Sequence, residues 1–143
     1  MRVSAKAEYA CIAMLELAAN HREPQPVRVK SIAETHGIPQ RFLVQILLQL
    51  KSAGLVVSLR GALGGYQLAR SPDKVSLADV INAMDREPAI RPNPLPASSS
   101  AAVQAIHGVW KEMQAREQRL LEGLTLAELV RRAQQSSELS YQI

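Results

Sequence analysis

A cation stands directly before a run of glycines near the middle of the sequence. Arg60 precedes residues 61–65, which read Gly-Ala-Leu-Gly-Gly, and strand-forming residues flank this run on both sides. This pattern predicts a β-hairpin with a glycine-rich turn. Glycines let a backbone approach a DNA duplex closely, and a guanidinium is attracted to the negative potential of a narrow minor groove. Arg60, Gly61, Gly64 and Gly65 are therefore candidate minor-groove contacts.

A second group of polar residues falls on one face of a predicted helix over residues 40–52. Apolar residues at helical spacing occupy one side of this helix. Glutamine can bond two polar atoms of adenine in the major groove, and arginine can do the same with guanine. This makes Gln40, Arg41 and Gln45 candidate base contacts. The outward face carries Gln40, Arg41, Val44, Gln45, Leu48 and Lys51.

The elements that would position these side chains follow the order of a winged helix. Residues 5–20 and 29–36 are predicted helices, and Gly37 and Pro39 mark a tight turn before the helix over 40–52. An ordinary packed helical hairpin would also explain these helices, but the hairpin that follows favours a DNA-binding fold. The sequence thus predicts a mainly α protein with a winged helix-turn-helix domain and a small β-hairpin wing.

The N-terminal end of the first predicted helix is a further candidate contact. Ser4 stands at the position of an N-cap. The first N–H groups of a helix have no partner within the helix and can hold a phosphate. Arg2, Lys6 and Tyr9 lie near Ser4 in the sequence, and we include all four among the predicted DNA contacts.

Charge and composition agree with a polyanionic partner and a single domain. The 143 residues carry a net charge of +4, and the basic excess lies entirely within residues 1–80. Aromatic residues make up only 3% of the chain, so the core must consist of aliphatic side chains that suit packed helices. No stretch approaches the length of an apolar membrane span. We expect a soluble, cytoplasmic protein without a membrane partner.

The C-terminal half has a different organisation. Prolines and serines over residues 87–101 predict a linker loop, and a long helix follows over 102–124. Apolar residues form a seam along this helix, which predicts a homodimer. Residues 1–86 would form the DNA-binding domain, and 125–143 a short helix, through about residue 132, and a tail. The seam comprises Val103, Ile106, Trp110, Met113, Leu120 and Leu124.

Motifs over nearly the whole chain resemble one known family. They include Arg2-Val3-Ser4, Ile32-Ala33-Glu34, Phe42-Leu43-Val44-Gln45, Ala53-Gly54-Leu55-Val56 and the segment from Arg60 to Tyr66. On these residues the sequence resembles the winged helix-turn-helix regulators typified by IscR, NsrR and CymR. The segment from Arg60 to Tyr66 is the most specific of these motifs.

The resemblance implies a homodimer on a palindromic operator of double-stranded DNA. Each recognition helix would enter a major groove, and each wing would enter a flanking minor groove. One departure concerns specificity, because Val44 stands where some members carry a glutamate that reads cytosine. The residues that match the family's DNA surface are Ser4, Gln40, Arg41, Gln45 and Arg60.

A larger departure concerns the cofactor. Cluster-binding members carry three cysteines before the dimer helix, whereas residues 87–107 contain none here. Glu8 and His107 match positions that supply a non-cysteine ligand in different members, and Cys11 is the single cysteine. Ordinary roles explain all three: a small core thiol, a solvated carboxylate and a polar helix flank. We expect no metal or cofactor, and an iron-sulfur cluster on these three residues is the alternative.

An enzyme is not expected from this sequence. The three histidines are isolated, and the glycine run lies in a hairpin, so it cannot open a helix as a nucleotide loop does. We expect a sequence-specific transcriptional regulator, with repression as the expected mode. A winged helix that binds a protein or RNA without operator specificity is the alternative.

Overall fold

The computed structural model describes residues 3–62, 64–85 and 93–142 of the chain. Arg2, Leu63 and the first part of the predicted linker therefore lie outside the described residues. The elements, in order, are α1 (Ala5–Ala19), α2 (Val29–His36), α3 (Gln40–Ser52), β1 (Val56–Leu59), β2 (Gly65–Leu68), the 3₁₀ helix η1 (Pro72–Lys74), α4 (Leu77–Met84), α5 (Ala101–Gly123) and α6 (Leu126–Gln142). This mainly α order with one antiparallel hairpin confirms the predicted fold class.

Helix α1 is the centre of the core. It contacts α2, α3, α4, α6 and β2. Ala7, Ala10 and Ala13 are fully buried, and Met14 and Leu17 extend the same core. Small side chains on several sides of α1 allow neighbouring backbones to come close, while one larger pair fills the remaining volume.

The turn between α2 and α3 has the geometry that its glycine predicts. Gly37 adopts a left-handed conformation with φ +66°, which favours glycine, and its N–H donates to the Ala33 carbonyl. Helix α3 then buries one face against the core. Phe42 is not part of this buried face, because 38% of it is exposed. The inward face consists of Leu43, Ile46, Leu47 and Leu50.

The wing is defined as β1, β2 and the turn between them. It is attached to the segment that connects α1 to α2. Its register pairs Val56 with Leu68 and Leu59 with Gly65. Val27 and Tyr66 form a further bridge by exchanging backbone hydrogen bonds of 2.9 and 2.8 Å. A Cβ on Gly65 would lie 2.3 Å from the Val27 carbonyl oxygen, so the close approach of these two backbones requires glycine.

The junction between α5 and α6 is hydrogen-bonded to residues at the start of α4 and just before it. The N–H of Leu77 donates to the Leu124 carbonyl at 2.8 Å, and the N–H of Leu126 donates to Val75 at 2.9 Å. Leu126 is fully buried in the domain core. These bonds hold the end of α5 and the start of α6 on the winged domain.

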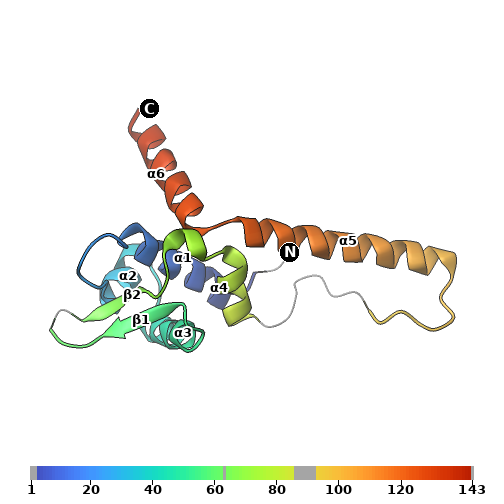
Figure 1. Ribbon diagram of the computed structural model, residues 1–143, viewed down its shortest axis with the longest axis horizontal. Helices are drawn as coiled ribbons and strands as arrows, with labels where there is room; N and C mark the ends of the chain where they lie inside the picture. Colours follow the sequence, from blue (N-terminus) through green and yellow to red (C-terminus); the bar gives the residue numbers. More distant parts are fainter. Residues whose placement is uncertain (1–2, 63, 86–92, 143) are drawn as a thin grey trace.

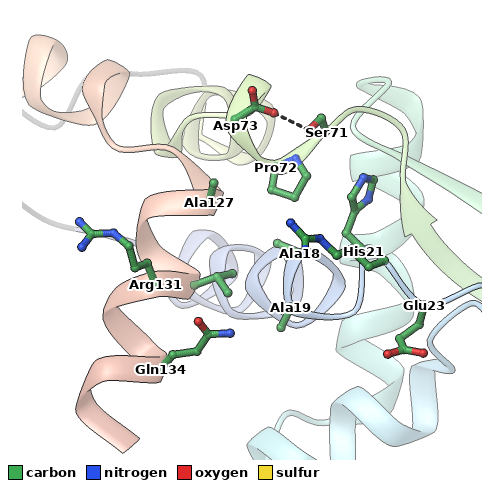
Figure 2. A pocket seen from close by; sticks show the side chains of 12 residues that line it. Ala18, Ala19, His21, Glu23, Ser71, Pro72, Asp73, Ala127, Arg131 and Gln134 are labelled. Carbon is green, nitrogen blue, oxygen red and sulfur yellow. Dashed lines mark hydrogen bonds between the residues drawn. The ribbon is translucent and has the colours of Figure 1, made fainter. Parts of the chain in front are cut away.

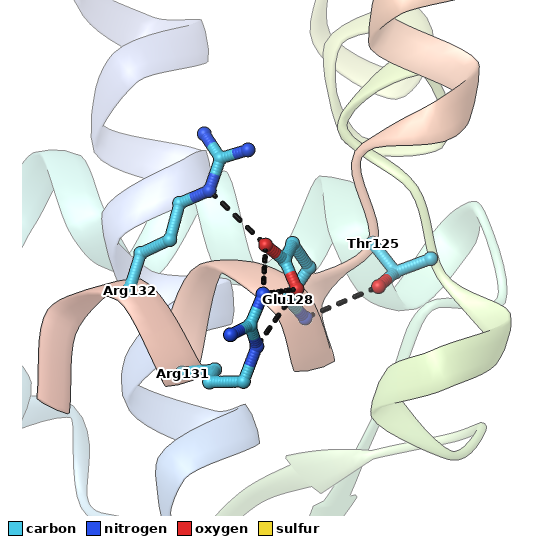
Figure 3. A network of polar contacts seen from close by, with 4 residues as sticks. All are labelled: Thr125, Glu128, Arg131 and Arg132. Atoms are coloured by element: carbon cyan, nitrogen blue, oxygen red, sulfur yellow. Dashed lines mark hydrogen bonds and ion pairs between the residues drawn. The ribbon is translucent and has the colours of Figure 1, made fainter. Parts of the chain in front are cut away.

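Helix α6 is longer than the sequence predicts, because it continues past Arg132 to Gln142. Figure 3 shows its first turns, where the Thr125 hydroxyl accepts a hydrogen bond of 3.2 Å from the N–H of Glu128. The Glu128 carboxylate also pairs with Arg131 at 2.5 Å and Arg132 at 3.3 Å. These ion pairs lower the pKa of Glu128, whose carboxylate stays charged. Pairs at this spacing stabilise a solvent-exposed helix. The sequence-based prediction did not include this stabilisation and ended the helix too early.

Helix α5 extends away from the winged domain (Figure 1). Ser100 caps its N-terminus by accepting a 3.2 Å bond from the N–H of Val103. Among the described residues of α5, Ala101–Gly123, none is buried. Within the described ranges, no helix combines the length and apolar character that crossing a membrane requires.

We predict that Gly65→Ala destabilises the protein by about 1–3 kcal/mol, because the new methyl group would push β2 away from Val27. Urea unfolding monitored by circular dichroism measures this change. Gly108→Ala is the matched control, since a Cβ there meets nothing within 4 Å and alanine favours a helix interior. Equal stability of the two variants would contradict the steric argument.

Candidate nucleic-acid interface

The outward face of α3 collects the predicted base contacts. Gln40, Arg41 and Gln45 are exposed, while the opposite face of the helix is buried in the core. Their side chains are therefore available to a ligand without any rearrangement of the fold. Val44 is half-buried and Leu48 is exposed on this same side.

The wing lies beside α3, as Figure 1 shows for β1 and β2. Arg60 and Gly61 are exposed at the end of β1, while Gly64 and Gly65 are half-buried in the return to β2. Gly61 has φ +111°, a conformation that other residues rarely adopt. A close approach to a duplex is therefore available at Arg60 and Gly61, whereas Gly64 and Gly65 shape the turn.

Two basic residues that the sequence did not single out as contacts position the wing. The Lys51 ammonium at the end of α3 donates a 2.8 Å hydrogen bond to the Ser58 hydroxyl on β1. The Arg28 guanidinium, just before α2, donates to the Ala62 carbonyl in the turn. In the sequence, only the positive charge of these two residues pointed to a role. Their hydrogen-bond partners lie in other elements and could not be identified from the sequence. Both contacts orient the wing relative to α3.

Ser4 has partners that the sequence did not indicate. Its hydroxyl accepts a 3.0 Å bond from the N–H of Ala7, as predicted for an N-cap, and it donates to the Asp85 carboxylate at 2.9 Å. A phosphate at this helix end would therefore meet the negative charge of Asp85. Asp85 follows α4 and is distant from Ser4 in the sequence, so no local pattern could reveal the contact.

The remaining N-terminal candidates behave differently from one another. Tyr9 is half-buried, and its ring packs edge-to-face on Phe42 with the ring centres 5.7 Å apart. This contact joins α1 to the start of α3 and explains why Phe42 does not enter the core. Lys6 is half-buried in the first turn of α1.

The cluster candidates do not form a ligand set. Burial of the Cys11 thiol, reinforced by the charges of Glu8 and Asp85, raises its pKa to about 11. The thiol is therefore protonated at neutral pH, so a metal ion would have to displace its proton to bind it. Within the described part of the chain, no three His, Cys, Asp or Glu residues form a possible metal site, and His107 on α5 is not grouped with Glu8 and Cys11. These residues do not fit an iron-sulfur cluster within one subunit.

A crevice of about 670 Å³ opens between the end of α1, η1 and the start of α6 (Figure 2). Ala18, Ala127 and Val130 contribute apolar lining, and His21 and Arg22 contribute polar groups. Its lining includes no residue of α3, β1 or β2. The crevice is therefore separate from the candidate DNA-binding surface.

Comparisons with known proteins agree with this geometry. Residues 3–132 match the Rrf2 family, described as "Iron-dependent Transcriptional regulator". The HTH-type transcriptional regulator IscR of Aliivibrio salmonicida is 34% identical over 131 residues, which cover 91% of this chain and 77% of that protein.

Solved structures extend the similarity to three dimensions. CymR, the global cysteine regulator of B. subtilis, superposes with a TM-score of 0.80 at 32% identity, covering 91% of this chain and 96% of that one. IscR of T. potens superposes with a TM-score of 0.79 at 34% identity, covering 95% and 90%. The family match covers most of the chain, the fold is a winged helix, and the relatives are named as transcriptional regulators. This chain therefore belongs to the Rrf2 family of transcriptional regulators and is not an enzyme.

Proposed function

We propose that this regulator binds a palindromic DNA operator as a homodimer and represses transcription. The observation that carries the proposal is the exposed face of α3 with Gln40, Arg41 and Gln45, beside a wing that exposes Arg60. Amide and guanidinium groups on a helix can read base edges in the major groove. A cation next to glycine can enter the minor groove from the same side of the domain.

The apolar face of α5 supports the homodimer. Val103, Ile106, Trp110, Met113 and Leu120 are all exposed large hydrophobic residues, and Leu120 reaches 63%. Glu117 interrupts this face between Met113 and Leu120, and the exposed apolar residues on either side of it need a partner surface. The same face of α5 on a second copy of the chain can supply this surface in a two-fold symmetric dimer. The two-fold symmetry of such a dimer matches the symmetry of a palindromic DNA site. Leu124 is half-buried at the end of this face.

We further propose that the protein works without an iron-sulfur cluster. One cysteine per chain supplies two thiols per dimer, and burial holds the thiol of Cys11 in its protonated form. A typical cluster needs four ligands, most of them thiolates. The signal that controls this regulator would then act through groups other than a bound cluster.

We predict that replacing Ile106 and Met113 together by glutamate yields monomeric or insoluble protein, because two charges would enter the apolar contact between α5 helices. Sedimentation velocity measures the outcome. Gln104→Glu with Ala115→Glu is the matched control, since it adds the same charge on the opposite face of α5 and should remain dimeric. A soluble dimer from the Ile106 and Met113 variant would disprove the proposed interface.

We predict that anaerobically purified protein is colourless and contains neither iron nor acid-labile sulfide. Ultraviolet-visible absorption with iron and sulfide assays measures this. A content near one cluster per subunit would show the opposite, and Glu8, Cys11 and His107 would then be the ligands to replace first.

We predict that Gln45→Ala and Arg60→Ala impair DNA binding in different ways. Gln45→Ala should cost roughly 1–3 kcal/mol on the operator and little on random DNA, because it removes a base contact. Arg60→Ala should weaken operator binding and flatten the slope of log K against log salt by about one unit.

Titrations against operator and scrambled duplexes at several salt concentrations separate these effects. Arg119→Ala is the control, because it removes the same charge from α5 and leaves the wing unchanged. If Arg60→Ala left the affinity and the salt slope at wild-type values, the hairpin would not be a DNA-binding wing. A weak salt dependence of the wild-type protein would favour a protein-binding module.

A further inference from the structure

The outward face of α3 contains an apolar strip among its polar residues. Leu48 is 46% exposed, and Val44 lies one turn before it and is half-buried. Residues Arg41, Val44, Gln45 and Leu48 share the spacing of one helix face, because about 3.6 residues complete a turn. Leu48 therefore lies on the side of α3 opposite to the buried Leu43 and Leu50.

The packing of the domain does not explain the apolar side chain of Leu48. The core-facing side chains of α3 are buried to 1% exposure or less, whereas Leu48 is on the exposed side and adds little to this packing. Single exposed leucines are common on protein surfaces. This one, however, lies one turn after Val44 on the face that carries Arg41 and Gln45 and that we propose for base contacts, where a polar side chain would gain more from water.

The major groove of DNA offers one apolar group to such a strip. Thymine carries a C5-methyl group at its groove edge, whereas the other base edges present hydrogen-bond donors and acceptors. Val44 and Leu48 are four residues apart, which corresponds to about 6 Å along the helix axis. Two base steps span about 7 Å along a strand, so the two side chains match methyl groups on different base pairs.

We propose that Leu48, with Val44 beside it, contacts thymine methyl groups in the major groove and thereby selects A·T pairs in each operator half-site. Gln45 on the same face supplies the matching hydrogen bonds to adenine. The ligand class is therefore a duplex with A·T pairs under the middle of α3. This inference rests on the proposed operator binding and adds a specificity that polar contacts alone would not supply.

The test uses a duplex selected from a random library by the wild-type protein, prepared once with thymine and once with deoxyuridine at every thymine position. Deoxyuridine keeps the base pairing and lacks only the methyl group. Each lost methyl contact should weaken binding about four-fold. One contact by Leu48 in each of two half-sites then gives a wild-type preference for thymine of about 15-fold, and the contacts of Val44 increase it further.

The variants assign the preference to residues. Leu48→Ala should reduce the thymine preference, and Val44→Ala with Leu48→Ala should bring the two duplexes within about two-fold of each other. Leu59→Ala is the matched control, because Leu59 is 44% exposed on the wing, which we place away from the major groove. It should keep the full preference, and circular dichroism checks that every variant is folded.

Each other outcome overturns a defined part of the argument. A wild-type protein that enriches no sequence would overturn the proposed function, and this inference with it. Equal wild-type affinity for the two duplexes would overturn the methyl contact while leaving operator binding intact. A full preference in the double variant, or its loss in Leu59→Ala, would show that other residues read the methyl groups.

Discussion

Ala7, Ala10 and Ala13 are fully buried because five elements approach α1 from different sides. Larger side chains at these positions would hold α3, α4 and α6 further apart, since protein interiors have no spare volume. The position of α3 therefore depends on the small residues of α1. The end of α5 and the start of α6 depend on the same core through Leu126 and the hydrogen bonds between 75–77 and 124–126.

The side chains of the candidate interface divide into proposed contacts and supports. Gln40, Arg41, Gln45 and Arg60 are exposed and available to DNA. Lys51 bonds Ser58, and Arg28 bonds Ala62, so these cations hold the wing against the helical part of the domain. A winged helix reads two grooves at once only if the helix and the wing keep a constant relation. The proposed contacts therefore depend on these supports.

The N-terminal end of α1 combines several negative groups with a protonated thiol. Asp85 accepts the hydrogen bond of Ser4 at the helix end, and its charge adds to that of Glu8 in raising the pKa of Cys11. Such surroundings disfavour a thiolate and hence metal ligation. The regulator belongs to a family described as iron-dependent, while the residues that the structure describes do not assemble a cluster site in one subunit.

Sequence alone determined the features that depend on residues a few positions apart. The turn at Gly37, the hairpin and the polar face of α3 were all visible as local patterns and are present in the structure. Only the tertiary structure decided the contact of Ser4 with Asp85, the edge-to-face packing of Tyr9 on Phe42 and the supports of the wing. These contacts join residues of different elements, and their energies depend on distances that exist only after the helices have packed around α1.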